Sequence, residues 1–271
     1  MNDKYRILLI DTSRPYTNDV NAQSHHPPAG LLAIASNILE SDIANKVTIK
    51  ILDASIQTNN IEELEQEIDE FAPDIVGLRC LNWFIELFET TIDYISNNHP
   101  HTKIVAGGPY FSASPQIAME RKTQIDYGVV GDGDQIFLNL IKSLIAQKPV
   151  ENVKGLHYRK GKHIFTTDPE PLIMDLDLLP VPHWDLIDFN PYQHFMGQAP
   201  ILRKAAPVLT SRGCPYRCTY CHELFQKKFR ARSAKHLFNE VQQLYDLGIK
   251  DILVIDDIFN FDQARVIDFF N

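Results

Sequence analysis

A chain of 271 residues, of which 44% are hydrophobic, is long enough to form two domains with a core each. Its formal net charge of −9 argues against general nucleic-acid binding. Four cysteines, three of them close together, do not make a disulfide framework and are typical of a reducing compartment, so we expect a cytoplasmic protein; no apolar run is long enough to span a membrane.

The first 148 residues alternate between short apolar runs and amphipathic stretches. Strands are predicted at residues 5–11, 47–52, 74–78, 103–106 and 126–130. Helices are predicted at residues 30–39, 61–71, 83–96, 114–122 and 135–146. Strands and helices that alternate in this way predict a doubly wound parallel sheet.

Small and polar residues follow the predicted strands. Ligands of a doubly wound sheet bind beyond the carboxyl ends of its strands, and glycines there let a bulky ligand approach the backbone. No GxGxxG motif is present, so a dinucleotide is not favoured. The candidate ligand contacts at these strand ends are Thr12, Ser13, Leu78, Cys80, Gly107, Gly108, Gly131 and Gly133, of which Cys80 also suits a small buried residue.

Residues 149–205 are predicted to connect two domains. Two apolar runs flank Lys160-Gly161-Lys162, which is a hairpin signal. The stretch 169–182 is proline-rich and is predicted to be extended. We expect His183 and Trp184 to be packing residues.

Three thiols lie four and then three residues apart in the stretch 214–221, which reads Cys-Pro-Tyr-Arg-Cys-Thr-Tyr-Cys. Iron–sulfur clusters are held by cysteine thiolates, usually four. Three thiolates in one loop therefore predict one iron whose coordination site must be filled by another ligand. Three other interpretations stay open: a CCCH zinc site with His222, a CxxCH haem attachment, or a thioredoxin-like CxxC.

The residues after this loop predict a helix at 233–247, ended by Gly248, and a strand at 252–255. Strand, cysteine loop, helix and strand fit the opening of a βα barrel, where chemistry lies at the carboxyl ends of the strands. Asp256 and Asp257 lie at such an end. Each could contact a ligand or cap the next helix, and Asp257 is the better candidate for the ligand.

The cysteine spacing resembles the CxxxCxxC loop of the radical S-adenosylmethionine (radical SAM) superfamily, in which one iron is left for the amino and carboxylate groups of SAM. Residues 207–213 fit that family's first barrel strand. The resemblance implies that Tyr220 packs beside the adenine of SAM and that Asp257 contacts SAM. The [4Fe-4S] cluster ligands that it implies are Cys214, Cys218 and Cys221.

Residues 1–148 resemble the cobalamin-binding domain that precedes many radical SAM cores. In that family Pro-Pro-x-Gly-Leu opens the first helix, as at 27–31; Gly-Gly follows the fourth strand, as at 107–108; and Gly-Glu-Gly-Glu follows the fifth, here Gly-Asp-Gly-Asp at 131–134. The cobalamin contacts that the resemblance adds to the strand-end residues are Pro28 and Gly30.

One departure from that family concerns the lower ligand of cobalt. Many cobalamin domains carry Asp-x-His-x-x-Gly in the first loop, and this sequence has no such motif. His194 and Gly197 form only the HxxG half and lie beyond the predicted sheet, while His25 and His26 have the wrong spacing. We therefore expect base-off cobalamin without a histidine ligand.

The resemblance implies a cobalamin-dependent radical SAM enzyme that cleaves SAM reductively to a 5′-deoxyadenosyl radical. The radical would serve methyl transfer to, or rearrangement or cyclisation of, an unactivated carbon. The implied partners are a small-molecule, lipid-like, tetrapyrrole-like or peptide substrate and a flavodoxin- or ferredoxin-type electron donor. A cobalamin-binding or sensing module with a vestigial cluster domain is the alternative.

The expected architecture is α/β in three parts. Residues 1–148 form a Rossmann-like cobalamin-binding domain, and residues 149–205 form a linker with a β-hairpin. Residues 206–271 form the first βα units of an incomplete radical SAM partial TIM barrel, because two strands cannot close a barrel.

Overall fold

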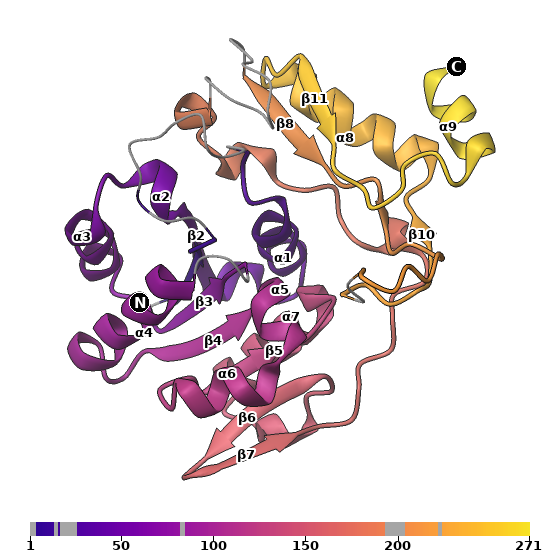
Figure 1. Ribbon diagram of the computed structural model, residues 1–271. Coiled ribbons are helices and arrows are strands. Elements are labelled where there is room, and N and C mark those ends of the chain that lie inside the picture. The colour runs from indigo at the N-terminus through magenta and orange to yellow at the C-terminus, as the bar shows by residue number, and fades with distance from the viewer. Residues whose placement is uncertain (1–3, 14–15, 17–25, 82–84, 193–203, 222–223) are drawn as a thin grey trace. The chain divides into compact units, whose positions relative to one another are not determined.

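The structure is a computed structural model that describes residues 4–13, 16, 26–81, 85–192, 204–221 and 224–271 (Figure 1). The chain divides into two compact units. The first unit contains Met1–Thr17 and Asn37–Pro171, and the second contains Asn18–Ser36 and Leu172–Asn271. This division falls at other residues than the predicted domain boundaries, since the predicted hairpin belongs to the first unit and residues 18–36 to the second.

The first unit is built on a seven-stranded sheet with the order β2-β1-β3-β4-β5-β6-β7. Neighbouring strands from β2 to β5 run parallel, which confirms the predicted parallel sheet. The chain order reverses at β1, and β3 lies on its other side. The strands are β1 (Tyr5–Asp11), β2 (Val47–Asp53), β3 (Ile75–Arg79), β4 (Lys103–Gly107), β5 (Tyr127–Val129), β6 (Leu156–Lys160) and β7 (His163–Thr166).

The hairpin of β6 and β7 extends the sheet, although the sequence predicts it as part of the linker. Gly161 has a positive φ of 61° in the tight turn between the two strands. β6 pairs antiparallel with β5, with Tyr158 opposite Tyr127, so the sheet is mixed rather than purely parallel. Pairing with β6 covers an edge of β5 that would otherwise be open.

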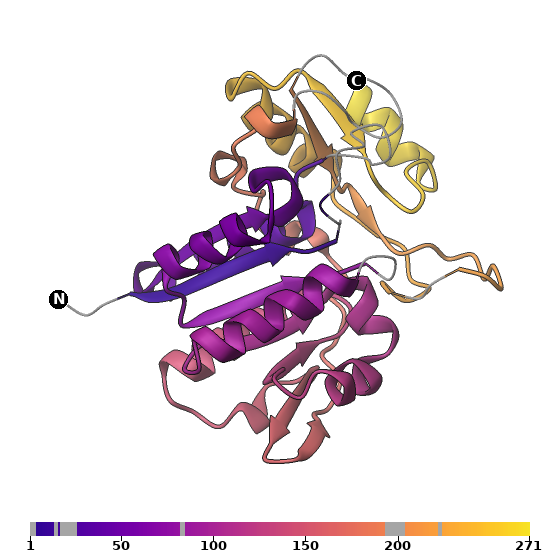
Figure 2. The same ribbon diagram turned by 60° about the vertical axis from the view of Figure 1, so that its left-hand side comes forward.

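Helices lie on both faces of this sheet (Figure 2). On one face, buried side chains of α3, α4, α5 and α6 pack with Leu8 and Ile10 of β1 in one core cluster. On the other face, Phe137 of α7 lies beside Gly77 and Leu9. The α-helices that carry residues of this unit are α1 (Ala29–Leu39), α2 (Ala54–Gln57), α3 (Ile61–Phe71), α4 (Ile85–Asn98), α5 (Gly108–Ala113), α6 (Pro115–Arg121) and α7 (Gly133–Ile145), and short 3-10 turns lie at Ala44–Lys46 and Val150–Asn152.

The predicted helix at 114–122 is only the second of two short helices in the structure. Ser114 leaves the helical conformation with φ −154° and ψ 65°, and Pro115 starts α6. Proline suits the first turn of a helix because it has no N–H to donate, so the break falls directly before it.

The second unit contains a βαβ motif of β8 (Ala205–Val208), α8 (Ala234–Asp246) and β11 (Asp251–Val254), followed by α9 (Gln263–Phe270). β8 and β11 pair in parallel, as the expected opening of a βα barrel requires. Between β8 and α8, β9 (Ser211–Arg212) and β10 (Arg230–Ala231) pair antiparallel. Short 3-10 turns lie at Leu176–Leu178, Trp184–Leu186 and Asn190–Tyr192.

The segment before β8 is held onto α8, β10 and Arg232, which lies between them, by buried polar contacts. The indole of Trp184, which is buried as expected, donates to Oε1 of Glu240 at 3.1 Å. Arg230 donates to the carbonyl of Ile173 at 3.1 Å, and Arg232 donates to the carbonyl of Pro180 at 3.2 Å. Among the residues described, no helix combines the length and the apolar character needed to cross a membrane.

Candidate cofactor sites

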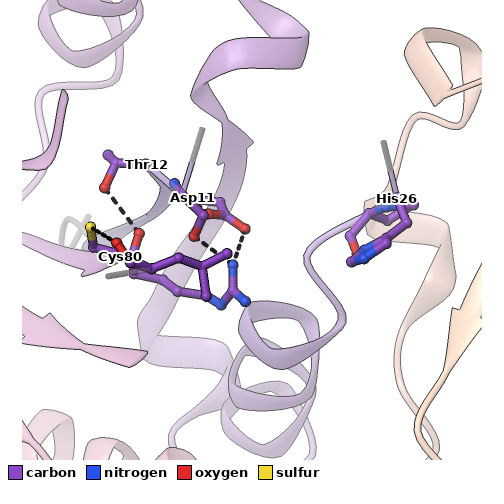
Figure 3. Close-up of polar contacts among 8 residues, drawn as sticks. Asp11, Thr12, His26 and Cys80 are labelled. Atoms are coloured by element: carbon purple, nitrogen blue, oxygen red, sulfur yellow. Dashed lines mark hydrogen bonds and ion pairs between the residues drawn. The ribbon is translucent and has the colours of Figure 1, made fainter. Parts of the chain in front are cut away.

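The carboxyl ends of β1 and β3 meet at the point where the strand order reverses, which is where doubly wound sheets bind ligands. Figure 3 shows the residues at this edge. The backbone N–H of Thr12 donates to the carbonyl of Arg79 at 2.9 Å, and its hydroxyl donates to the same oxygen at 3.0 Å. The loops that follow the two central strands are therefore tied together by Thr12.

An ion pair between the buried Asp11 and the partly exposed Arg79 lies at these strand ends. Nη1 of Arg79 is 2.6 Å from Oδ2 of Asp11 and donates to the Ser13 hydroxyl at 2.7 Å. Asp11 is only 3% exposed, and its Oδ1 accepts the backbone N–H of Ser13 at 2.9 Å. Thr12 and Ser13, both predicted ligand contacts, thus belong to a hydrogen-bonded floor that the Asp11–Arg79 pair holds in place.

Glycine is required where the end of β4 approaches the end of β3. Gly108 has φ +80°, and a Cβ there would lie 2.9 Å from Cγ of Arg79 and 3.3 Å from the carbonyl oxygen of Cys80. A Cβ on Gly107 would meet only the carbonyl oxygen of Val129, at 3.8 Å. Gly107 therefore offers open backbone at this edge, while Gly108 permits the close approach of two strand ends.

The other glycines of the predicted set lie after β5. Gly131 has φ +75°, and its N–H donates to the Ser112 hydroxyl at 3.1 Å. Gly133 is the first residue of α7. Pairing of β4 with β3 and β5 places the residues after all three strands along the same edge of the sheet.

Leu78 and Cys80 lie at this edge but turn their side chains into the core cluster of the first unit. The thiol of Cys80 donates to the carbonyl of Leu81 at 3.1 Å, and burial raises the pKa of this thiol to about 12. Because both side chains are in the core, a ligand at this edge could contact these two residues only through their backbone atoms.

Pro28 and Gly30 belong to the second unit, where they lie at the start of α1. A Cβ on Gly30 would meet no atom within 4 Å. His26 has its Nδ1 3.3 Å from the carbonyl oxygen of Pro27. His25 and the HxxG half motif at 194–197 lie outside the described residues.

The stretch 213–229, called the cluster loop below, carries the three clustered cysteines between β9 and β10. The two strands close its root, where Ser211 lies opposite Ala231. The backbone N–H of Arg232 also donates to the carbonyl of Thr210 at 3.0 Å. Gly213 has φ +80°, and a Cβ there would clash with the backbone carbonyl of Lys228. The loop therefore leaves and rejoins the fold through a narrow, fixed base.

The three thiols of the cluster loop are free of disulfides. Cys214 is half-buried, and Cys218 and Cys221 are exposed. Cys221 donates its N–H to the carbonyl of Cys218 at 3.2 Å, which folds the end of the motif into a turn. By its chemistry this donor set suits an iron–sulfur cluster. In the part of the chain that the structure describes, however, no three His, Cys, Asp or Glu side chains are gathered as a metal site, and His222 lies outside that part.

The two predicted SAM contacts are both exposed. Tyr220, in the cluster loop, has 91% of its surface exposed. Asp257 follows β11. The cap of α9 is Asp262, whose side chain accepts the N–H of Arg265, so the alternative that Asp256 or Asp257 caps this helix is wrong.

The sequence analysis does not predict that Asp11 and Arg79 pair at the carboxyl edge of the sheet. Both are charged residues at the carboxyl ends of predicted apolar strands, and that position is the signal that could have found them.

Comparison with known proteins shows which proteins the chain is similar to. Residues 18–141 match the family model described as the B12 binding domain. An uncharacterized methyltransferase of Pyrococcus horikoshii is 30% identical over 245 residues, which cover 89% of this chain and 51% of that protein. The anaerobic magnesium-protoporphyrin IX monomethyl ester cyclase of Synechocystis is 27% identical over 89% of this chain and 47% of that protein. The chain spans about half the length of these curated relatives.

The fold is also found in a solved structure. The radical S-adenosylmethionine methyltransferase TsrM of Kitasatospora setae superimposes with a TM-score of 0.71 at 20% identity, over 97% of this chain and 49% of TsrM. The mixed sheet with helices on both faces and the βαβ motif after it share this fold. These matches support the predicted resemblance to proteins in which a B12-binding domain precedes a radical SAM core.

Proposed function

We propose that this protein acts as a cobalamin-dependent radical SAM enzyme that methylates, rearranges or cyclises an unactivated carbon substrate. The observation that carries the proposal is the cluster loop. It places three disulfide-free thiols beyond the carboxyl end of the first strand of a βαβ motif. Chemistry in βα barrels lies at this end of the strands.

Cys214, Cys218 and Cys221 would hold a [4Fe-4S] cluster, drawing together around it as it binds. The cluster, when bound, would supply the electron that cleaves SAM reductively. The exposed ring of Tyr220 is free to cover the adenine of SAM, and the exposed carboxylate of Asp257 is free to accept hydrogen bonds from SAM.

Cobalamin would lie on the carboxyl edge of the first unit's sheet. Thr12 and Ser13 form the polar floor there, and Gly107 offers open backbone. The cofactor, when bound, would carry the methyl group or assist the radical step. We propose that it is bound base-off, since the sequence has no Asp-x-His-x-x-Gly motif.

The substrate class is proposed from a relative, and the electron donor is proposed from the chemistry. The named relatives include a cyclase of magnesium-protoporphyrin IX monomethyl ester, which favours a small-molecule or tetrapyrrole-like substrate over a lipid-like or peptide one. Reductive chemistry needs an electron donor, and a flavodoxin- or ferredoxin-type protein would supply it.

The cluster ligands are tested by counting iron and sulfide in anaerobically reconstituted protein. The wild type and Cys80→Ala should each bind about four irons per chain, because Cys80 is buried in the other unit. Alanine at position 214, 218 or 221 should remove most of the iron. Equal loss in Cys80→Ala, or tight zinc without iron, would contradict the three-ligand site and favour the zinc alternative.

A second candidate is a cobalamin-binding or sensing module with a vestigial cluster domain. It is favoured by the fact that the described thiols are not gathered as a metal site. Such a module would bind cobalamin, seen by its absorption spectrum, with no iron and no effect of the three cysteine substitutions.

A further inference from the structure

A polar network fixes the root of the cluster loop, and Thr210 lies at its centre. Thr210 is fully buried and precedes β9. Its N–H and its hydroxyl both donate to Asp256, which follows β11. Its carbonyl accepts from the backbone N–H of Arg232 at 3.0 Å and from Nη1 of Arg265 at 3.3 Å. Every backbone polar group of Thr210 is thus bonded to a residue far away in the sequence.

The carboxylate of Asp256 is fully used by this network. Its Oδ1 accepts the backbone N–H groups of Thr210 and Ser211 at 2.6 and 3.0 Å. Its Oδ2 accepts the hydroxyl of Thr210 and the hydroxyl of Ser211, the latter at 2.7 Å. An ionised carboxylate offers about four lone-pair sites, so these four bonds leave none for a ligand. Asp256 therefore does not suit the SAM or substrate contact that the sequence offers for it.

Arg265 of α9 completes the network from the other side. Its Nη1 donates to the hydroxyl of Thr210 at 3.0 Å and to the carbonyl of Arg232 at 3.5 Å. Its Nη2 donates to the carbonyl of Phe259 at 3.1 Å. One guanidinium therefore joins Thr210, three residues before the cluster loop, to Arg232, three residues after it. The hydroxyl of Thr210 also links this cation to the anion of Asp256.

We propose that Asp256 and Arg265 are positioning residues of the cluster loop, which they hold through Thr210 and Ser211. This role rests on the proposed function of the loop as a cluster site. Charge-assisted hydrogen bonds to two consecutive backbone amides fix the direction in which the chain enters the loop. The position of Cys214, the half-buried first thiol, is then set by the end of β11 and by α9.

The first test needs no metal. Asp256→Asn is compared with Asp268→Asn, an equal loss of charge on the exposed side of α9. In the metal-free chain, amide hydrogen exchange of Thr210 and Ser211 should rise about tenfold in Asp256→Asn, the effect of losing charge-assisted hydrogen bonds. Exchange within α8 should stay at the wild-type rate. Asp268→Asn should change neither the exchange of Thr210 and Ser211 nor that of α8. Unchanged exchange at Thr210, or an equal rise throughout α8, would overturn the role.

The second test measures the cluster. In reconstituted protein, Asp256→Asn should lose iron to a chelator about tenfold faster than the wild type and Asp268→Asn, with a changed electron paramagnetic resonance (EPR) line shape. Thr210→Val should behave like Asp256→Asn, whereas Thr210→Ser keeps the hydroxyl and should behave like the wild type. Equal release rates in all these variants would overturn the positioning role while leaving the cluster site intact.

The two tests separate this inference from the proposed function. A wild-type chain that binds no iron contradicts the proposed function and with it any role of Asp256 towards a cluster. Iron in the wild type together with unchanged exchange and release in Asp256→Asn contradicts the positioning role alone.

Discussion

At the residue scale, Glu240 is a buried carboxylic acid with one unpaired oxygen. Its side chain is 1% exposed, and among the described residues Oε2 has no hydrogen-bond partner. Burial raises the pKa of Glu240 from 4.5 to about 7; Arg232 and the indole of Trp184 lower it, and Asp256 raises it further. Between pH 4.5 and about 7, the folded chain therefore holds a proton on Glu240 that the unfolded chain releases.

This shift predicts a pH dependence of stability. An acid with a raised folded-state pKa contributes its full stability below pH 4.5, and this contribution is lost as the pH rises to about 7. The shift corresponds to about 3 kcal/mol in the free energy of unfolding. Glu240→Gln should flatten this slope, measured by denaturant unfolding at pH 5 and pH 8, and Asp268→Asn should keep it. A slope in Glu240→Gln equal to that of the wild type would contradict the assignment.

The Asp11–Arg79 pair gives a second prediction at this scale. Arg79→Ala leaves a carboxylate that is 3% exposed without its cation, so the free energy of unfolding should fall by about 2–4 kcal/mol. Lys50→Ala is a control, because that lysine and its partner Glu67 are each about a third exposed, at 34% and 37%, so its loss should cost under about 1 kcal/mol. Similar losses in the two variants would show that Arg79 does not support the floor of the site.

The three clustered cysteines could be predicted from the sequence, whereas the Asp11–Arg79 pair could not. The three thiols belong to one loop, so their spacing alone identifies them. Asp11 and Arg79 are 68 residues apart, and they meet only because β1 and β3 are neighbours in the sheet. The hydrogen-bonded role of Asp256 escapes the sequence for the same reason.

At the element scale, the root of the cluster loop depends on Gly213. Alanine at this position would be strained by the φ of +80°, and its Cβ would clash with the carbonyl of Lys228. Gly161 also has a positive φ, but a Cβ there meets no atom within 4 Å. Gly161→Ala should therefore cost about 1 kcal/mol, and Gly213→Ala should cost more and lower the iron bound after reconstitution. Thermal unfolding and iron content measure both; equal costs would mean that the loop root can relax.

Apolar runs predict most elements of the fold but not how they combine. β1 begins and ends at the predicted residues, and β4 differs from its predicted bounds by one residue. The sequence predicts a helix only from residue 114, so it misses α5 at Gly108–Ala113, which ends directly before Pro115 starts α6. The addition of β6 and β7 to the sheet depends on the edge that β5 leaves open, which local sequence does not encode.

At the scale of the whole molecule, the two units differ in how well their strands are covered. β1 pairs on both edges and is largely buried, whereas β11 pairs with β8 and has Ile252 and Val254 each 36% exposed. Parallel strands made of consecutive apolar residues are usually covered on both faces. We predict that amides of β11 exchange hydrogen faster than those of β1, measured by native-state exchange. Equal protection of the two strands would contradict this difference in stability.

The central claim is that the cluster loop holds a four-iron cluster with one iron left for SAM. The most direct measurement is EPR of the anaerobically reconstituted, reduced protein before and after addition of SAM. We predict the signal of a reduced [4Fe-4S] cluster, and we predict that SAM changes its line shape. A cluster signal that SAM leaves unchanged, or protein that takes up zinc and no iron, would contradict the account.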